Sequence, residues 1–303
     1  MDIAASDAVA APSSLLLALA ASARPKQWTK NLIVFGPLVF ARDLLSTGLL
    51  LRALLTFVAF CLVSGSVYVV NDLLDVEKDR QHPDKRLRPI ASGQVSAGQA
   101  KALALLLGLA GLACSLPAGP FVLAAAAGYL ALMFAYSTLL KHLVIIDVFC
   151  LAAGFILRAV AGALAIHVVI SPWLYLCTLL LALFLGLSKR QNELLVLQES
   201  ASNHRRSLDE YSPEMLEQMT SIVTASTIMA YALYTFSAES LPENHAMMLT
   251  IPFVLYGIFR YQYLVHRRNL GGAPELVLLG DLPLMLDIVL WAATAIGVLY
   301  FTP

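Results

Sequence analysis

The sequence predicts an all-α polytopic membrane protein, a bundle of about nine transmembrane helices with a polar cavity that faces the cytoplasm. Composition is the first reason, because the chain is 59% hydrophobic and only 13% charged. Soluble domains are about 45–50% apolar and about 25% charged. Long apolar stretches also recur along the chain, and nearly all basic residues fall in every second connection between them. These features are typical of helices that cross a bilayer repeatedly.

Nine apolar stretches mark the expected spans. They cover residues 32–41, 49–70, 102–116, 121–140, 143–166, 172–187, 219–238, 246–259 and 284–301. Several are shorter than the ~20 residues that a perpendicular span needs, so we expect the helices to extend past these borders, with eight spans as the alternative count. Ahead of them, residues 1–23 are expected to form a tail and a short surface helix, and residues 24–303 a single transmembrane domain.

The basic residues predict which ends of the spans face the cytoplasm. If the N-terminus is cytoplasmic, nine spans place the following segments inside: 1–31, 71–101, the region around 141, 188–215 and 260–281. These segments contain every Lys and Arg of the chain except Arg42, Arg52 and Arg158. Because Lys and Arg concentrate on the cytoplasmic side of membrane proteins, the polar motifs described below are expected to face the cytoplasm.

The most informative stretch is NDLLDVEKD, which runs from Asn71 to Asp79 and follows directly on the apolar segment 49–70. If the helix continues through it, Asp72, Asp75 and Asp79 lie at i, i+3 and i+7, within roughly 60° of one another on one face. Proteins hold Mg²⁺ with a few carboxylates, and phosphate oxygens and waters complete its octahedron. Three aligned acids at a membrane exit therefore favour a site for Mg²⁺ and a diphosphate over a solvated helix end.

Basic residues near the helix ends are the expected partners of phosphate groups. Lys26 and Lys30 flank Trp28 and are either interfacial anchors or inward-facing phosphate ligands, and the sequence leaves both readings open. The other loop bases either serve topology and attraction to anionic lipid, or converge on one cavity. The basic candidates are Lys26, Lys30, Lys85, Arg86, Arg88, Lys141, Lys189 and Arg190.

Two charged residues, Asp147 and Arg158, are predicted to lie within the membrane. On one helix they face directions within about 20° of each other but lie about 16 Å apart along the axis, which is too far for a direct ion pair. Charged side chains at such depth normally face the bundle interior or a polar cavity. We therefore expect Asp147 to contribute to the site, and the deeper Arg158 to tie helices together.

Several familiar catalytic motifs are missing from the sequence. It contains no H-E-x-x-H pair, no nucleophile elbow and no Walker-type glycine loop, and no nucleic acid is expected as a partner. A reaction between two phosphorylated molecules needs no general base if the attacking group is already an anion. The motifs that are present thus favour metal-supported phosphate chemistry.

These motifs resemble those of the UbiA-type superfamily of intramembrane prenyltransferases, which share nine helices and an N-D-x-x-D-x-x-x-D loop after the second. Within it the chain is most similar to the decaprenyl-phosphate phosphoribosyltransferases, and the resemblance spans nearly the whole chain from about residue 24. One departure is Ala273, which stands where that family has an acidic residue. The similar stretches are RPKQWTKN (24–31), NDLLDVEKDRQHPDKRLRPIASG (71–93), LKH (140–142), GFILRAVAG (154–162), SKRQNEL (188–194) and RY (260–261).

The connection after the sixth span separates two branches of this superfamily. Quinone- and haem-type prenyltransferases carry a second aspartate motif of D-x-x-x-D type in that loop. Here the loop from Ser188 to Glu193 has one acid behind two bases. A second metal cluster for a prenyl diphosphate is therefore not expected, whereas the basic pair suits a ligand with an additional phosphate.

The resemblance implies a Mg²⁺-dependent enzyme of the bacterial inner membrane. It implies transfer of 5-phosphoribosyl from phosphoribosyl diphosphate to a polyprenyl (decaprenyl-type) phosphate, with release of diphosphate, for the synthesis of arabinose precursors of the cell envelope. Asp72, Asp75 and Asp79 are the implied Mg²⁺ ligands and, with Asn71, the implied catalytic residues. The implied substrate-binding residues are the basic candidates above together with Tyr136, Asp147 and Arg158.

Two alternatives differ in class. The first is a UbiA-type enzyme that moves a prenyl group from prenyl diphosphate to an aromatic or other acceptor. The second is a transporter in which Asp147 and Arg158 form a charge pathway. Transporters often have duplicated halves and helices broken near the midplane, whereas here the polar groups crowd one side of the membrane.

Overall fold

The apolar stretches form α-helices, as expected where the backbone polar groups must be satisfied without water. The computed structural model describes residues 14–82, 84–198, 206–238, 241–268, 277 and 280–301, and no strand occurs among them. Within these residues eight helices are long and apolar enough to cross a membrane, which confirms the predicted fold class of an integral membrane protein. They are α3 (Thr47–Leu74), α5 (Ala97–Ser115), α6 (Pro120–Thr138), α7 (Ile146–Ala165), α8 (Pro172–Gln198), α9 (Pro213–Ser237), α10 (Ile251–Arg268) and α12 (Leu282–Phe301).

Short helices join or precede the long ones. The α-helical ones are α1 (Leu15–Ser22), α2 (Gly36–Phe40) and α4 (Val76–Gln81). The 3₁₀ helices are η1 (Pro25–Phe35), η2 (Lys85–Leu87), η3 (Leu116–Ala118), η4 (Leu140–His142), η5 (Arg206–Glu210) and η6 (Ala246–Thr250). The short helix expected within residues 1–23 is α1, and residues 1–13 lie outside the described part of the chain.

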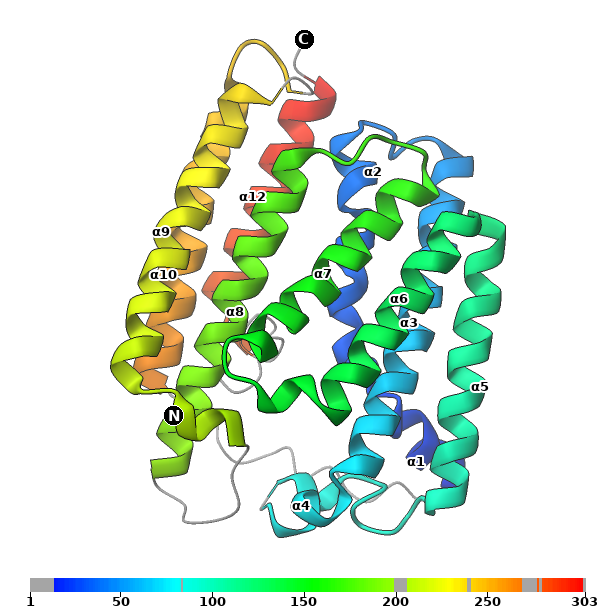
Figure 1. Cartoon of the computed structure of the whole chain (residues 1–303). Helices are drawn as coiled ribbons and strands as arrows, with labels where there is room; N and C mark the ends of the chain where they lie inside the picture. Colours follow the sequence, from blue (N-terminus) through cyan, green and yellow to red (C-terminus); the bar gives the residue numbers. More distant parts are fainter. Residues whose placement is uncertain are drawn as a thin grey trace.

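Helix α7 crosses the middle of the bundle (Figure 1). It packs against η1 and α2, against α6 on one side and against α8 on the other. Helices α3 and α5 complete the first side, and α9, α10 and α12 complete the second. We call the end of the bundle at which α3 and α8 finish, and at which α1 and α4 lie, the site end. The opposite end, where α2 lies, is the far end.

The first expected span, 32–41, is the main difference from the predicted helices. In its place the chain forms η1 and then α2, which together run from the site end to the far end (Figure 1). Two features oppose a regular α-helix here. Pro37 lacks an N–H group, and Asn31 is fully buried with its side chain bonded to residues of α3 and α7. The expected count of nine is therefore close to the eight long helices of the described residues, with this broken segment as the further crossing.

Two helices end at residues other than those predicted, and both differences affect the site. Helix α8 continues to Gln198, so the segment Ser188–Glu193, expected as a loop, is helical. No Gly or Pro lies within this segment, and its Arg190 has partners on α6 and α7 inside the bundle. Helix α3 ends at Leu74, because Asp75 adopts φ −100° and ψ 11°, and α4 begins at Val76. The three acids of the motif thus do not share one uninterrupted helix.

Small residues let the site-bearing helices approach closely. A Cβ on Gly111 of α5 would lie 2.7 Å from Cγ1 of Val63 and 3.0 Å from the carbonyl oxygen of Ala59, both on α3. A Cβ on Gly162 of α7 would overlap the carbonyl oxygen of Val34 in η1. Such contacts between small residues and backbone are typical of helix packing in membranes, where van der Waals contact replaces the hydrophobic effect.

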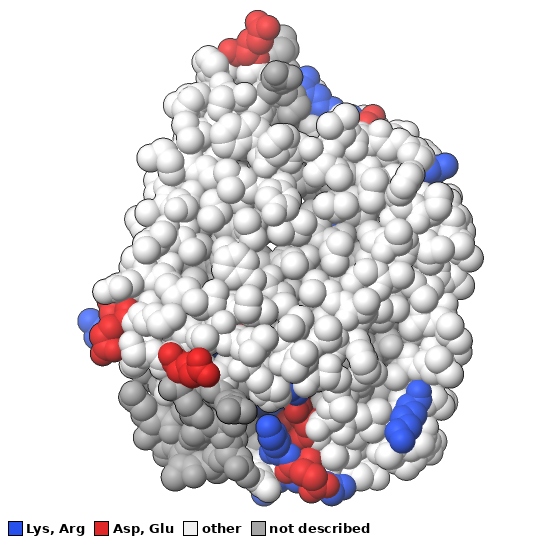
Figure 2. Space-filling view, in the orientation of Figure 1, with Lys and Arg blue, Asp and Glu red and all other residues white. Residues whose placement is uncertain are grey.

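Figure 2 shows a broad band without charged side chains across the face in view. On the face in view, most acidic and basic side chains lie toward the site end and a few lie at the far end. Contacts across the site end bring together segments that sequence analysis placed on one side of the membrane. Arg24 contacts Asp72, Asp75 contacts Lys141, and the Ser207 hydroxyl donates to the Lys141 carbonyl.

Candidate active site

The acids of the NDLLDVEKD stretch are paired with cations from other segments. Asp72 and Asp79 are buried, with 3% and 4% exposure. Nη1 of Arg88, in the loop after η2, lies 3.1 Å from Oδ1 of Asp72 and 2.6 Å from Oδ2 of Asp79. Arg24, at the turn between α1 and η1, donates a second bond to Asp72. Two of the three predicted acids therefore converge on one guanidinium nitrogen.

Asp75 faces a different cation. Nζ of Lys141 lies 2.8 Å and 3.1 Å from its two carboxylate oxygens. Lys141 belongs to η4, between α6 and α7, and its side chain is 6% exposed. The break at Asp75 separates this carboxylate from the other two. We call the acids Asp72, Asp75 and Asp79, with the cations Arg24, Arg88 and Lys141, the exit cluster.

A second group of charges surrounds Arg190 of α8, and only its Glu193 side chain, at 30% exposure, is partly open to solvent. Arg190 is 0% exposed, and its Nε lies 2.7 Å from Oδ2 of Asp147, which is also 0% exposed. Nη1 of Arg190 contacts Glu193, and Nη2 donates to the Tyr136 hydroxyl at 3.2 Å. The Tyr211 hydroxyl donates to Oδ1 of Asp147 at 2.8 Å. We call these five residues the α8 cluster.

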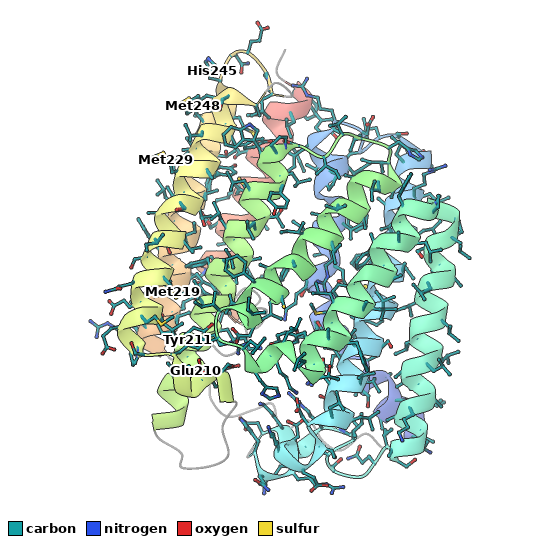
Figure 3. The ribbon with its side chains drawn as sticks, viewed as in Figure 1. Glu210, Tyr211, Met219, Met229, His245 and Met248 are labelled. Carbon is teal, nitrogen blue, oxygen red and sulfur yellow. The ribbon has the colours of Figure 1, made fainter. Side chains whose placement is uncertain are left out.

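Tyr211 also holds the start of α7 in a strained conformation. Its hydroxyl oxygen accepts the backbone N–H of Ile145 at 2.7 Å, and Ile145 has a φ of 68°, which β-branched residues rarely adopt. Burial and the bond to Asp147 raise the pKa of Tyr211, so the hydroxyl stays a donor. In Figure 3 Tyr211 lies at the site end below Met219 of α9. The residue thus fixes both Asp147 and the turn ahead of it.

Arg158 ties helices together, as expected. Its Nε donates to Oδ1 of Asn31 in η1 at 2.6 Å, and its Nη2 donates to the Tyr129 hydroxyl in α6 at 2.7 Å. The guanidinium lies over the Tyr129 ring, 4.5 Å from its centroid. Asn31 in turn donates to Ser64 of α3 at 3.3 Å. This network lies deeper in the bundle than the two clusters, and it joins η1, α3, α6 and α7.

The remaining basic candidates lie at the site end but outside both clusters. Lys26, Lys85 and Arg86 are exposed. Lys30 is half-buried and donates to the Gln27 side chain, and Nζ of Lys189 lies 4.0 Å from Glu193. Asn71 is half-buried beside Asp72. The family departure at Ala273 falls outside the described residues.

Sequence reasoning missed two residues that contact the predicted acids. Arg24 stands in the basic patch before η1, and its distance of 48 residues from Asp72 gave no sign of their pairing. Tyr211 follows η5 and lies 64 residues from Asp147. A polar residue beside an amphipathic segment is too common to be singled out, so only the fold identifies both.

The exit cluster suits a divalent cation although its acids are paired. Among the described residues no three Asp, Glu, His or Cys side chains stand ready to hold a metal ion. Two buried carboxylates nevertheless meet at one positively charged nitrogen, and carboxylate oxygens are the preferred ligands of Mg²⁺. The side chain between them, Arg88, is 27% exposed and lies in a loop. The donor set therefore fits Mg²⁺ if Arg88 moves to another anion.

Comparisons with known proteins show which family the chain belongs to. The model of the UbiA prenyltransferase family matches residues 31–279. Decaprenyl-phosphate phosphoribosyltransferase of Corynebacterium glutamicum is 34% identical, covering 96% of this chain and 90% of the relative. The protein of the same name from Mycolicibacterium smegmatis is 31% identical, covering 96% and 95%.

A solved structure shares the fold. The structure of a UbiA homologue from Archaeoglobus fulgidus bound to DMAPP and Mg²⁺ superposes with a TM-score of 0.71 at 19% identity, covering 95% of this chain and 100% of that one. At this identity the likeness concerns the fold alone. The long family match and the two relatives establish the membership: the chain belongs to the UbiA prenyltransferase family.

Proposed function

We propose that the protein transfers the 5-phosphoribosyl group from phosphoribosyl diphosphate to a polyprenyl phosphate and releases diphosphate. The observation that carries the proposal is the exit cluster, in which three carboxylates and three cations meet at one end of a membrane bundle. The relatives that match almost the whole chain are named for this reaction with decaprenyl phosphate. The reaction needs a divalent metal for one diphosphate and cations for further phosphates, and the cluster contains groups for both.

Ligand binding is proposed to exchange the partners within the exit cluster. Without ligand each acid neutralises a cation of the protein. With metal and substrate bound, Asp72 and Asp79 would hold the metal, with Asp75 as the third acid, and Arg24, Arg88 and Lys141 would bond phosphate oxygens instead. Charge balance is kept throughout. Each carboxylate exchanges a cation of the protein for the metal ion, and each cation exchanges a carboxylate for a phosphate.

The chemistry requires no proton transfer. An oxygen of the lipid phosphate, already an anion, attacks C1 of the ribose while the bond from C1 to the diphosphate oxygen breaks. Mg²⁺, when bound, neutralises the diphosphate and stabilises it as the leaving group. The protein's cations hold the two reactants in line, which is catalysis by position and electrostatics. Asn71, beside Asp72, is proposed to hydrogen-bond the ribose or a phosphate.

The membrane supplies the acceptor. An apolar groove of about 330 Å³ between α3 and α6 includes Val70, two residues before Asp72, and Ser137, four residues before Lys141. This surface suits part of a polyprenyl chain whose phosphate lies at the site end. The positive charges at the same end, on Lys26, Lys85, Arg86 and Lys189, would attract anionic substrates. We place the protein in the bacterial inner membrane with this end in the cytoplasm, where it supplies arabinose precursors for the cell envelope.

The test uses the purified full chain in proteoliposomes with polyprenyl phosphate, Mg²⁺ and labelled phosphoribosyl diphosphate. We expect label in the lipid phase and release of diphosphate, with loss of both when EDTA is added. Asp72→Asn is expected to stop transfer, whereas Glu77→Gln on α4, whose side chain is 76% exposed, serves as the matched control and keeps it. If diphosphate is released only from a prenyl diphosphate, the protein is a prenyltransferase and the proposal is wrong.

A further inference from the structure

The α8 cluster differs from an ordinary phosphate-binding site in that all three nitrogens of its guanidinium already bond other groups of the protein. Arg190 uses Nε for Asp147, Nη1 for Glu193 and Nη2 for Tyr136, and its side chain is 0% exposed. These partners come from α7, from α8 itself and from α6. A guanidinium held on three sides in the bundle cannot turn to a phosphate as a loop arginine can. The expected role of Arg190 as a phosphate ligand is therefore not favoured by its geometry.

Two acids share the guanidinium of Arg190. Asp147 contacts its Nε and Glu193 its Nη1, so two carboxylates flank a single positive group. The other oxygen of Asp147 is satisfied by the Tyr211 hydroxyl at 2.8 Å and the Val148 N–H at 2.9 Å. Partners of this kind orient a carboxylate in the way that outer-shell groups orient metal ligands. What occupies the centre, however, is part of the protein.

We propose that Arg190 is a positioning residue that acts as a built-in cation between Asp147 and Glu193, so that this half of the site needs no metal ion. The inference rests on the proposed function, because it concerns where the enzyme binds metal. It predicts that removal of the guanidinium leaves two carboxylates without their shared cation, which a divalent ion can then replace. Metal binding by the intact protein is confined to the exit cluster.

The built-in cation also accounts for the position of neighbouring site residues. Arg190 links α6 and α8 to the first turn of α7, and η4 with Lys141 lies between α6 and α7. Glu193, held by Arg190, lies 4.0 Å from Nζ of Lys189, the partly exposed base of the same helix. A permanent cation keeps this geometry whether or not metal is present. If a metal ion stood in place of Arg190, this geometry would depend on the concentration of metal.

The test counts Mn²⁺ ions bound to the purified full chain in detergent, from the EPR signal of the free ion. Arg190→Ser is expected to bind one more ion than the wild type. Arg190→Lys keeps a cation between the acids, and Arg190→Ser/Glu193→Gln leaves only one acid, so both should return to the wild-type number. Arg260→Ser is the matched control, because Arg260 bonds a single carboxylate, Asp281, at 3.0 Å and 2.8 Å, and its loss should create no metal site.

If Arg190→Ser is too unstable for ion counting, its Tm measured with and without Mn²⁺ tests the same inference. Mn²⁺ should then raise the Tm of Arg190→Ser by more than it raises that of Arg190→Ser/Glu193→Gln, because the double variant keeps only the exit cluster as a metal site. The inference is overturned if Arg190→Ser binds the wild-type number of ions, or if Mn²⁺ raises its Tm no more than that of the double variant. Failure of the proposed function is read separately, from whether Asp72→Asn removes the ion that the wild type binds.

Discussion

The exit cluster and the α8 cluster contain the same kinds of charge but differ in how firmly their cations are held. In the exit cluster, Arg24 and Arg88 are 23% and 27% exposed and come from a turn and a loop. In the α8 cluster, Arg190 is 0% exposed and lies within a helix. The comparison teaches that the exposure and backbone setting of an arginine, rather than its charge, decide whether its ion pairs form a site or a support.

The physical reason is desolvation. A partly exposed arginine that leaves its carboxylate is met by water or by a ligand, so the exchange has a small free-energy change. A fully buried one leaves an uncompensated charge behind, which is strongly unfavourable. We therefore expect substitutions in the exit cluster to affect catalysis and metal affinity, and substitutions in the α8 cluster to affect stability first.

The largest effect is expected for Asp72→Ala. This change removes the carboxylate on which Arg24 and Arg88 converge, and it should lower the rate of phosphoribosyl transfer about 100-fold or more. The Tm should change little, because the cations released are partly exposed. Transfer assays beside thermal unfolding measure both. Full activity in this variant would show that Asp72 is not needed for transfer, and the proposed difference between the two clusters would then be wrong.

Asp147→Ala is the corresponding change in the α8 cluster. It leaves Arg190 buried with one carboxylate fewer, and breaking a buried pair in this way destabilises by about 3–5 kcal/mol. Thermal unfolding in detergent is the measurement. A variant as stable as the wild type, but inactive, would show that Asp147 acts on substrate and not as a support.

Arg88→Ala tests the exchange of partners more finely. Without Arg88, the acids Asp72 and Asp79 lose a competitor of the metal, so the half-saturating Mg²⁺ concentration should fall by about five-fold. The KM for phosphoribosyl diphosphate should rise about 10-fold or more, because a charge-assisted bond to phosphate is lost. Steady-state kinetics at varied Mg²⁺ separate the two. A higher half-saturating Mg²⁺ concentration in the variant would contradict the proposed exchange of partners.

The smallest effect is expected for Tyr211→Phe. It removes one bond to Asp147 and one from the N–H of Ile145, while Arg190 and the Val148 N–H still hold the carboxylate. The free energy of unfolding should fall by about 1 kcal/mol, with transfer reduced only a few-fold. Denaturation and transfer assays on the pair of proteins test this. If the free energy of unfolding fell as much as in Asp147→Ala, Tyr211 would be as important for stability as Asp147, which contradicts this prediction.

Sequence reasoning predicted the fold class and the segments that meet at the site. Hydrophobic stretches and the distribution of Lys and Arg are physical requirements of a bilayer, so they are visible without a structure. The role of Arg158 also followed from its depth, and the structure confirms that it joins helices. Helical spacing predicted that Asp72 and Asp79 lie together, and both contact Arg88, although the helix breaks at Asp75 between them.

The remaining features depended on contacts between distant parts of the chain. Asp75 turns to Lys141 because α3 ends at Leu74, and the sequence has no Gly or Pro there to indicate the break. The sequence did not predict that α8 continues through Arg190, because a run of charged residues after an apolar stretch is typical of a loop. Only packing against α6 and α7 makes a buried helical arginine favourable at this position.

The central claim is that the exit cluster gives up its own cations to bind a metal ion together with a diphosphate. Pulsed EPR on protein with Mn²⁺ and phosphoribosyl diphosphate tests this most directly, through the coupling between the bound ion and phosphorus. We predict a phosphorus coupling in the wild type and in Glu77→Gln, and its loss in Asp72→Ala. Equal coupling in wild type and Asp72→Ala would contradict the account.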